Sequence, residues 1–272
     1  MHEPRRTHDA DATRPAPPHA ALPHAAPPHA SLPHPLVEAT SDARAVEILS
    51  HELRSPITTI HLGTKVLRRE EPAIPERVRL AVVEAVDAEA ERLYRLVEDL
   101  LAVARHDRGA APLPVRPLLL QRWLPDVLDA AASGSALLRI EARVPDRLPP
   151  VVADDTALAH VIRNLLTNAE RYAPEGMPVE VDATDLGERV AVRVADHGPG
   201  LDDGDTELVF EPFYRSARAA GAGSAAGLGL AAVRALVQAM GGVVSAGNRA
   251  GGGAVVGFEL AVVDDGEADP GG

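Results

Sequence analysis

The stretch ERVRLAVVEAVDAEAERLYRLVEDLLAVARH, residues 76–106, decides the fold of the first half of this chain. Its apolar residues recur every seven positions, which is typical of a long amphipathic helix that packs against other helices. In that frame the inward positions are Val83, Ala90, Val97 and Ala104 at a, and Val86, Leu93 and Leu100 at d. We therefore expect one continuous helix from Glu76 to His106.

The same period predicts an earlier helix from about Thr40 to Arg69. Its inward positions are Val46, Leu53, Ile60 and Leu67 at a, and Leu49, Pro56 and Gly63 at d. Pro72 and Pro75 separate the two helices, because proline lacks an amide donor and disfavours helix in the residue before it. A single hairpin would leave its apolar seam exposed, so the sequence predicts a homodimer in which two hairpins form a four-helix bundle.

Both ends of the chain differ in composition from the rest. Residues 1–35 hold 9 of the 24 prolines and 6 of the 11 histidines, with Pro-His pairs five residues apart. Such a tract buries little apolar surface, so we expect disorder. A low-complexity linker is favoured over a metal-binding or docking arm. The acidic segment 264–272 is also expected to be disordered.

The overall composition excludes several classes of protein. The 272 residues carry 27 basic and 40 acidic side chains, a net charge of −13, which argues against binding to nucleic acid or anionic lipid. There is no cysteine, which excludes disulfides and thiolate sites. No apolar stretch is long enough to span a membrane, and the N-terminus does not have the pattern of a signal peptide. These features predict a cytoplasmic protein with no membrane span.

The second half of the chain mixes strands and helices after a Gly/Ala/Pro-rich joint at 109–117. Helices are expected at Leu118–Ala132, Asp155–Tyr172 and Leu228–Met240. Strands are expected at Leu138–Val144, Val151–Ala153, Val179–Ala183, Arg189–Ala195, Val243–Ala246 and Ala254–Leu260. Several strands beside segregated helices predict an α/β sandwich with helices on one face of a mixed sheet. The chain is thus α+β, with a helical hairpin at 36–108, a linker at 109–117 and an α/β domain at 118–263.

The first chemical motif is Ser50-His51-Glu52-Leu53-Arg54-Ser55-Pro56. An exposed helical histidine is usually surface decoration, but its neighbours favour a function. Glu52 is placed to orient or deprotonate the ring, which makes a ring nitrogen a better nucleophile. Pro56 predicts a bend beside His51, and Ser55 lies one turn further on the same face.

The second motif is the helical segment 164–172. Asn164 and Asn168 share a helix face on which amide oxygens suit Mg²⁺, and Arg171 can reach phosphate from nearly the same face. Two asparagines on a wet helix face is the simpler alternative.

The third and fourth motifs are glycine-rich. Asp196-His197-Gly198-Pro199-Gly200 follows a strand, where Asp196 is suited to accept a hydrogen bond from a purine amine and the glycines allow close approach of a ring. Further on, Phe210–Arg215 precede an Ala/Gly/Ser-rich segment, expected to be a flexible lid, and then Gly227-Leu228-Gly229, which open a helix with free amides suited to phosphate.

Together these motifs resemble the transmitter core of a two-component sensor histidine kinase, over residues 40–262. His51–Pro56 resembles the H box, 164–172 the N box, 196–200 the G1 box, 210–213 the F box and 227–229 the G2 box. The resemblance implies a phosphoacceptor hairpin followed by an ATP-binding domain of the type shared with gyrase B, Hsp90 and MutL. Its implied ATP-binding residues are Asn164, Asn168, Arg171, Tyr172, Asp196, Gly198, Gly200, Phe210, Phe213, Gly227, Leu228 and Gly229.

The implied activity is ATP-dependent autophosphorylation of His51, followed by transfer to an aspartate of a response regulator. Glu52 would act as base or orienter, and Asn168 would bind Mg²⁺. Ser55 stands where Thr or Asn is usual in kinases that are also phosphatases, and its hydroxyl is a candidate for orienting water. Since no sensor domain precedes the hairpin, a separate sensor protein is an expected partner.

Three departures from the family pattern bear on the alternatives. Ser55 leaves the phosphatase activity open, Arg171 replaces the usual lysine of the N box, and Ala225 stands where the G2 box usually has a glycine. A degenerate kinase that serves as a dimeric, regulator-binding scaffold is therefore one alternative. A serine kinase of the anti-sigma type is another, although it would not need the hairpin with His51.

Overall fold

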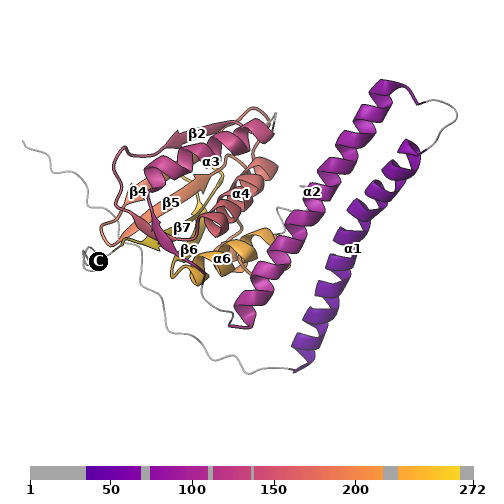
Figure 1. Ribbon diagram of the computed structural model, residues 1–272. Helices are drawn as coiled ribbons and strands as arrows, with labels where there is room; N and C mark the ends of the chain where they lie inside the picture. The colour runs from indigo at the N-terminus through magenta and orange to yellow at the C-terminus, as the bar shows by residue number, and fades with distance from the viewer. Residues whose placement is uncertain (1–34, 69–73, 110–112, 136–137, 217–225, 264–272) are drawn as a thin grey trace, which may run out of the picture.

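The computed structural model describes residues 35–68, 74–109, 113–135, 138–216 and 226–263. The two predicted disordered tails and most of the predicted lid lie outside these ranges, apart from Pro35. In the described part, a helical hairpin precedes a sheet with three longer helices, as Figure 1 shows. No described helix is both long enough and apolar enough to cross a lipid bilayer.

The hairpin consists of α1 (Pro35–Leu67) and α2 (Glu76–Asp107). Helix α1 begins five residues before the predicted start, because proline fits the first helical position, where its missing N–H is not needed. It continues through Pro56. At Gly63 a Cβ atom would lie 2.4 Å from Val86 Cγ2, so the two helices are in close contact at this predicted inward position.

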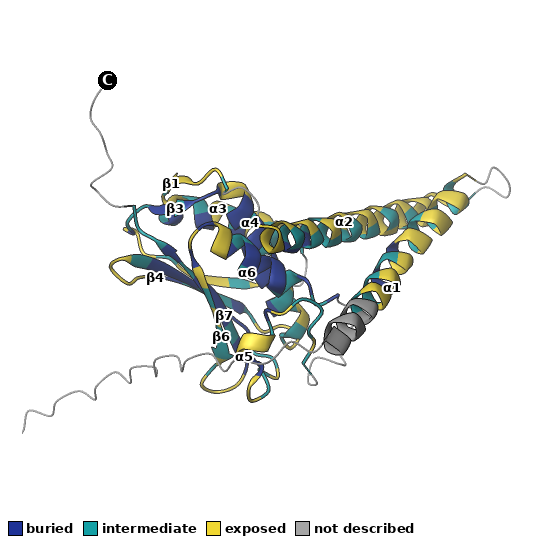
Figure 2. Cartoon of the chain, turned by 90° about the horizontal axis from the view of Figure 1, so that it is seen from below, coloured by how far each residue is buried: buried dark blue, intermediate teal, exposed yellow. Residues whose placement is uncertain are grey.

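Most residues of the hairpin are exposed or half-buried within one chain, as the yellow and teal of α1 and α2 in Figure 2 show. The exposed large apolar side chains on the two helices are Val46, Ile57, Leu62, Val78, Leu80, Val83, Tyr94, Val97 and Leu101. This exposure is what the predicted pairing of two hairpins would cover.

The second part of the chain is built on a five-stranded sheet with strand order β2-β4-β5-β7-β6. Its strands are β2 (Ile140–Arg143), β4 (Val179–Asp185), β5 (Arg189–Ala195), β6 (Val243–Asn248) and β7 (Ala254–Ala261). Strands β2 and β4 are parallel and the other neighbours are antiparallel, so the predicted mixed sheet is confirmed.

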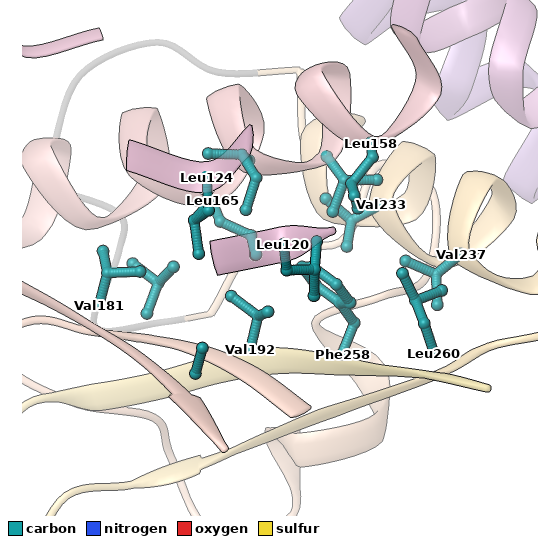
Figure 3. Packing of buried hydrophobic residues seen from close by; sticks show 14 of the residues in the cluster. Leu120, Leu124, Leu158, Leu165, Val181, Val192, Val233, Val237, Phe258 and Leu260 are labelled. Carbon is teal, nitrogen blue, oxygen red and sulfur yellow. The ribbon is translucent and has the colours of Figure 1, made fainter. Parts of the chain in front are cut away.

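Helices α3 (Leu120–Gly134), α4 (Asp155–Tyr172) and α6 (Gly229–Ala239) cover one face of this sheet (Figures 1 and 2). Between them lies the main core, in which Leu124, Leu165 and Val233 of the helices meet Val192 and Phe258 of the sheet (Figure 3). Burial of these side chains holds the helices on the sheet, and this confirms the predicted α/β sandwich.

Two short elements were not predicted. Strand β1 (Arg116–Leu118) takes the end of the predicted linker and also Leu118, which was wrongly predicted to begin a helix. It pairs with β3 (Val151–Ala153) in a separate two-stranded sheet. Pro117 is compatible with this edge strand, since an edge does not require every amide to donate. Helix α5 (Asp205–Leu208) is one turn, too short to produce a periodic pattern.

The hairpin docks on the second domain through α2, which packs against α6 (Figures 1 and 2). Val103, Leu228, Ala231 and Ala232 form a small buried apolar cluster at this contact. The partly buried side chains packed against the cluster are Leu49, Leu96, Leu100, Ala102 and Phe213. This contact places the N-terminus of α6 and the adjoining face of α4 next to the hairpin.

Candidate nucleotide and phosphoacceptor site

A cleft of about 270 Å³ lies where α4, the loop after β5 and the start of α6 meet the hairpin. It contains ten of the predicted site residues, from four separate motifs. These are Glu52, Asn164, Asn168, Arg171, Tyr172, Asp196, Gly200, Gly227, Leu228 and Gly229. The fold therefore gathers residues that are up to 177 positions apart in sequence.

Helix α4 presents the two asparagines to the cleft. Asp154 caps its N-terminus by accepting a hydrogen bond from the Ala157 amide at 2.7 Å. The opposite side of the helix is buried in the core. This burial sets the rotation of α4, so that Asn164 and Asn168 line the cleft. Arg171 lies in the last turn and lines the same cleft.

Asp196 follows β5 and is only 4% exposed. Its Oδ1 accepts hydrogen bonds from the amides of Gly198, at 2.8 Å, and Ala254, at 3.1 Å. These bonds hold the carboxylate in place. A Cβ at Gly198 would lie 2.5 Å from the Tyr172 carbonyl oxygen, so this turn requires a glycine.

Just before α6, the backbone at Gly227 passes close to the backbone at Tyr214. Gly227 has φ +70°, and a Cβ there would lie 2.6 Å from the Tyr214 carbonyl oxygen. The Tyr214 hydroxyl donates to Asp205 Oδ1 at 2.6 Å, and this hydrogen bond raises the pKa of Tyr214. The bond ties the segment before the predicted lid to α5.

On the hairpin side, Glu52 is 6% exposed and receives a hydrogen bond from Arg92 at 3.0 Å. His51 and Ser55 are exposed on α1 and are not among the residues that line the cleft. The structure therefore brings the neighbour of His51 to the cleft, with the histidine itself outside it.

Three other predicted nucleotide contacts lie elsewhere. Phe210 is 2% exposed and belongs to the main core, and Phe213 packs against the small apolar cluster beside α2. Gly198 contacts the Tyr172 backbone behind the cleft. These three residues support the shape of the site in this structure and do not line it.

Sequence reasoning missed the hairpin residues of the cleft: Arg92, Arg95, Leu96 and Asp99. It also missed His160, whose Nε2 lies 2.7 Å from Asp99 Oδ1. One feature of the sequence did indicate that α2 packs against a second partner. Leu96 and Val103, both at position g of the seven-residue frame, extend the apolar face of α2 beyond the a and d positions, as expected for a helix with a second packing partner.

The residues of the cleft fit a magnesium nucleotide. Side-chain amide oxygens are hard ligands of the kind that Mg²⁺ accepts alongside water and phosphate. Close-packed glycines let the backbone approach a ligand, and helix N-termini favour anions. Among the described residues, no group of three or more His, Cys, Asp or Glu side chains is placed to hold a metal ion.

Comparison with known families assigns both parts of the chain. Residues 42–109 match the His Kinase A (phospho-acceptor) domain, and residues 153–264 match the histidine kinase-, DNA gyrase B- and HSP90-like ATPase family. The chain has the transmitter core of a two-component histidine kinase. The resemblance inferred from its motifs is thereby confirmed.

Curated relatives and solved structures agree with this assignment. The chain is 32% identical to sensor protein KdpD of Mycobacterium tuberculosis over 84% of its length, and 33% identical to sensor histidine kinase CpxA of Escherichia coli over 73%. The crystal structure of full-length ShkA in complex with AMPPNP matches 81% of the chain with TM-score 0.56 and 30% identity. The histidine kinase AdeS of Acinetobacter baumannii shares the fold, with TM-score 0.58 over 79% of this chain and 98% of that one, at 23% identity.

The chain spans only part of its curated relatives. It covers 28% of the KdpD sequence and 42% of the CpxA sequence. The kinase core is thus the portion that these proteins share.

Proposed function

We propose that this chain is an ATP-dependent protein-histidine kinase that phosphorylates its own His51 and passes the phosphoryl group to an aspartate of a response regulator. The observation that carries the proposal is the cleft itself. It joins Asn168 and Asp196 of the ATP-binding domain to Glu52, the residue next to His51.

In this proposal, Asp196 accepts a hydrogen bond from the exocyclic amine of adenine. Its Oδ1 is already bonded to two backbone amides, which leaves Oδ2 to face the base. Asn168, with Asn164, would hold Mg²⁺ against the phosphates, and Arg171 would bind a phosphate oxygen. The bound cation would offset negative charge as the phosphoryl group is transferred.

His51 would then act as the nucleophile. A ring nitrogen forms a bond to the γ-phosphorus while the bond from that phosphorus to the bridging oxygen breaks, and ADP leaves with the electron pair. The proton on the other ring nitrogen is the one that Glu52 would orient or accept. Because phosphoryl transfer depends mainly on positioning and charge, little further chemistry is required of the protein.

A homodimer and a receiver domain are the proposed partners. The exposed apolar side chains of the hairpin support pairing of two copies, and the phospho-acceptor domain family supports a role toward response regulators in general. Thr58, Thr59 and Leu62, beyond His51 on α1, are the proposed docking face for the receiver. Thr58 and Leu62 are exposed and Thr59 is half-buried. ATP and receiver domains occur in the cytoplasm, where these two domains would act.

A scaffold without kinase activity is less well supported. Such a protein has no need to keep its nucleotide residues, yet Asn164, Asn168 and Asp196 are all present and line one cleft. The departure at Ala225 falls outside the described residues.

The test is autophosphorylation with ATP labelled at either the α- or the γ-phosphate, in the presence of Mg²⁺. The proposal predicts that only γ-label enters the protein, and that the label is lost in acid and kept in base, as for a phosphohistidine. Acid-stable label would indicate a hydroxyl acceptor and contradict the proposal. Measurable nucleotide binding without label would favour the scaffold.

A further inference from the structure

The interface between the hairpin and the ATP-binding domain contains a buried carboxylate, that of Asp99 on α2. Asp99 is 8% exposed. Its Oδ1 accepts a hydrogen bond from Asn164 Nδ2 at 2.7 Å and lies 2.7 Å from His160 Nε2. These three residues are called the Asp99 contact below. A carboxylate at this depth needs such partners, and it binds them more strongly than an exposed group does.

The Asp99 contact joins three helices. Asn164 Nδ2 also donates to the Gly229 carbonyl oxygen at 3.2 Å, so this one amide links α4 to both α2 and the start of α6. Beside it, Arg163 donates to Glu98 at 2.9 Å, which adds a second link from α4 to α2. The small apolar cluster around Leu228 and Val103 lies in the same interface.

The docked arrangement does not place the phosphoacceptor at the nucleotide. His51 is exposed and lies outside the set of residues that line the cleft, and Glu52 is held by Arg92. Transfer requires the γ-phosphorus within contact distance of a ring nitrogen and in line with it. Transfer to His51 of the same chain therefore requires the ATP-binding domain to move relative to the hairpin.

We propose that the Asp99 contact restrains the ATP-binding domain on the hairpin in a position that precedes phosphoryl transfer, so that breaking it speeds autophosphorylation. The inference rests on the proposed function, and it assigns to Asp99 and His160 a regulatory role in that reaction. Asn164 belongs both to this contact and to the proposed Mg²⁺ site, so the restraint acts directly on the helix that holds the nucleotide.

The test compares the full-length variants Asp99→Ala and His160→Ala with wild type and with Asp87→Ala, which removes an exposed carboxylate from the same helix. Initial rates of autophosphorylation are measured at saturating MgATP. Hydrogen exchange without nucleotide is followed at residues 96–103 and 226–232. We expect rates about threefold to tenfold higher and faster exchange in both segments for Asp99→Ala and His160→Ala, as for loss of a hydrogen bond of typical net strength.

The Asp87→Ala control is expected to match wild type in both measurements. Because Asp99 takes part in both bonds of the contact, the double variant should show no further increase over Asp99→Ala. Unchanged exchange, a rate that stays the same or falls, or additive effects in the double variant would each overturn the proposal. A wild type that takes up no label would contradict the proposed function, and the exchange measurement would still decide whether Asp99 holds the two domains together.

Discussion

Asp196, the proposed adenine contact, is held in one position by its own surroundings. Two backbone amides, from its own loop and from the start of β7, donate to the same carboxylate oxygen. The close approach of Gly253, where a Cβ would lie 2.0 Å from the Asp196 carbonyl oxygen, leaves the loop little freedom. The preorganised group avoids part of the ordering cost of binding.

Replacement of Asp196 by Asn should weaken binding of an ATP analogue by about tenfold to a hundredfold, because the Asn oxygen stays with the two backbone amides and its NH₂ group then faces the adenine amine, where two donors cannot form a hydrogen bond. Isothermal titration with MgAMPPNP provides the measurement. Asp203→Asn, an exposed neighbour in the same loop, is the control and should bind as wild type does. Equal affinity for all three proteins would remove Asp196 from the site.

Ten of the residues that line the cleft were predicted from sequence, but Asp99 and His160 were not. The motif residues were recognisable because each motif is a short local pattern. Asp99 and His160 are 61 positions apart, and each is an ordinary polar residue on its own helix. Only the docking of α2 on α4 gives either one a role, and no local pattern encodes that docking.

At the scale of elements, the start of α6 depends on Gly227. Its φ of +70° suits glycine, and the Tyr214 carbonyl oxygen occupies the place of a side chain. The segment between Tyr214 and α6 is therefore fixed at its far end by backbone geometry, next to the proposed phosphate site.

Gly227→Ala should lower the free energy of unfolding by about 1–3 kcal/mol, since an L-residue is strained at this φ. Thermal unfolding measures this change, and the affinity for MgAMPPNP should fall with it. Gly134→Ala is the matched control, because nothing lies within 4 Å of a Cβ there and its φ is not in the left-handed region. A Gly227→Ala protein as stable as the control would contradict this account of the turn.

The elements with a clear period were predictable, and the short ones were not. Helix α4 and strands β3 and β5 have the bounds expected from sequence, since capping residues and apolar runs mark their ends. Strand β1 and helix α5 contain three and four residues. Strand β1 forms because it pairs with β3, and helix α5 follows the turn at Gly204. Neither cause produces a periodic pattern in the local sequence.

At the scale of the whole molecule, the hairpin has two sets of apolar contacts. Leu100 and Val103 meet the ATP-binding domain of the same chain, while Val83 and Val97 stay exposed. The exposed set is the surface expected to pair with a second hairpin. The two surfaces together explain why α2 has a broader apolar face than a simple hairpin needs.

Val83→Glu should therefore shift the chain from dimer to monomer, because it places a charge in the apolar seam. Light scattering on eluted protein should give twice the chain mass of 28.6 kDa for wild type and a single chain mass for the variant. Ala88→Glu, at an outward position of the same helix, should remain dimeric. A monomeric wild type would contradict the predicted bundle.

The central claim is that the γ-phosphate of ATP is transferred to His51, and the most direct test is autophosphorylation of wild type beside His51→Ala and Asn168→Ala. The account predicts acid-labile label on wild type only. His51→Ala should bind MgAMPPNP with wild-type affinity, and Asn168→Ala should bind it weakly. Label that persists in His51→Ala would show that the phosphoacceptor is another residue and would contradict the account.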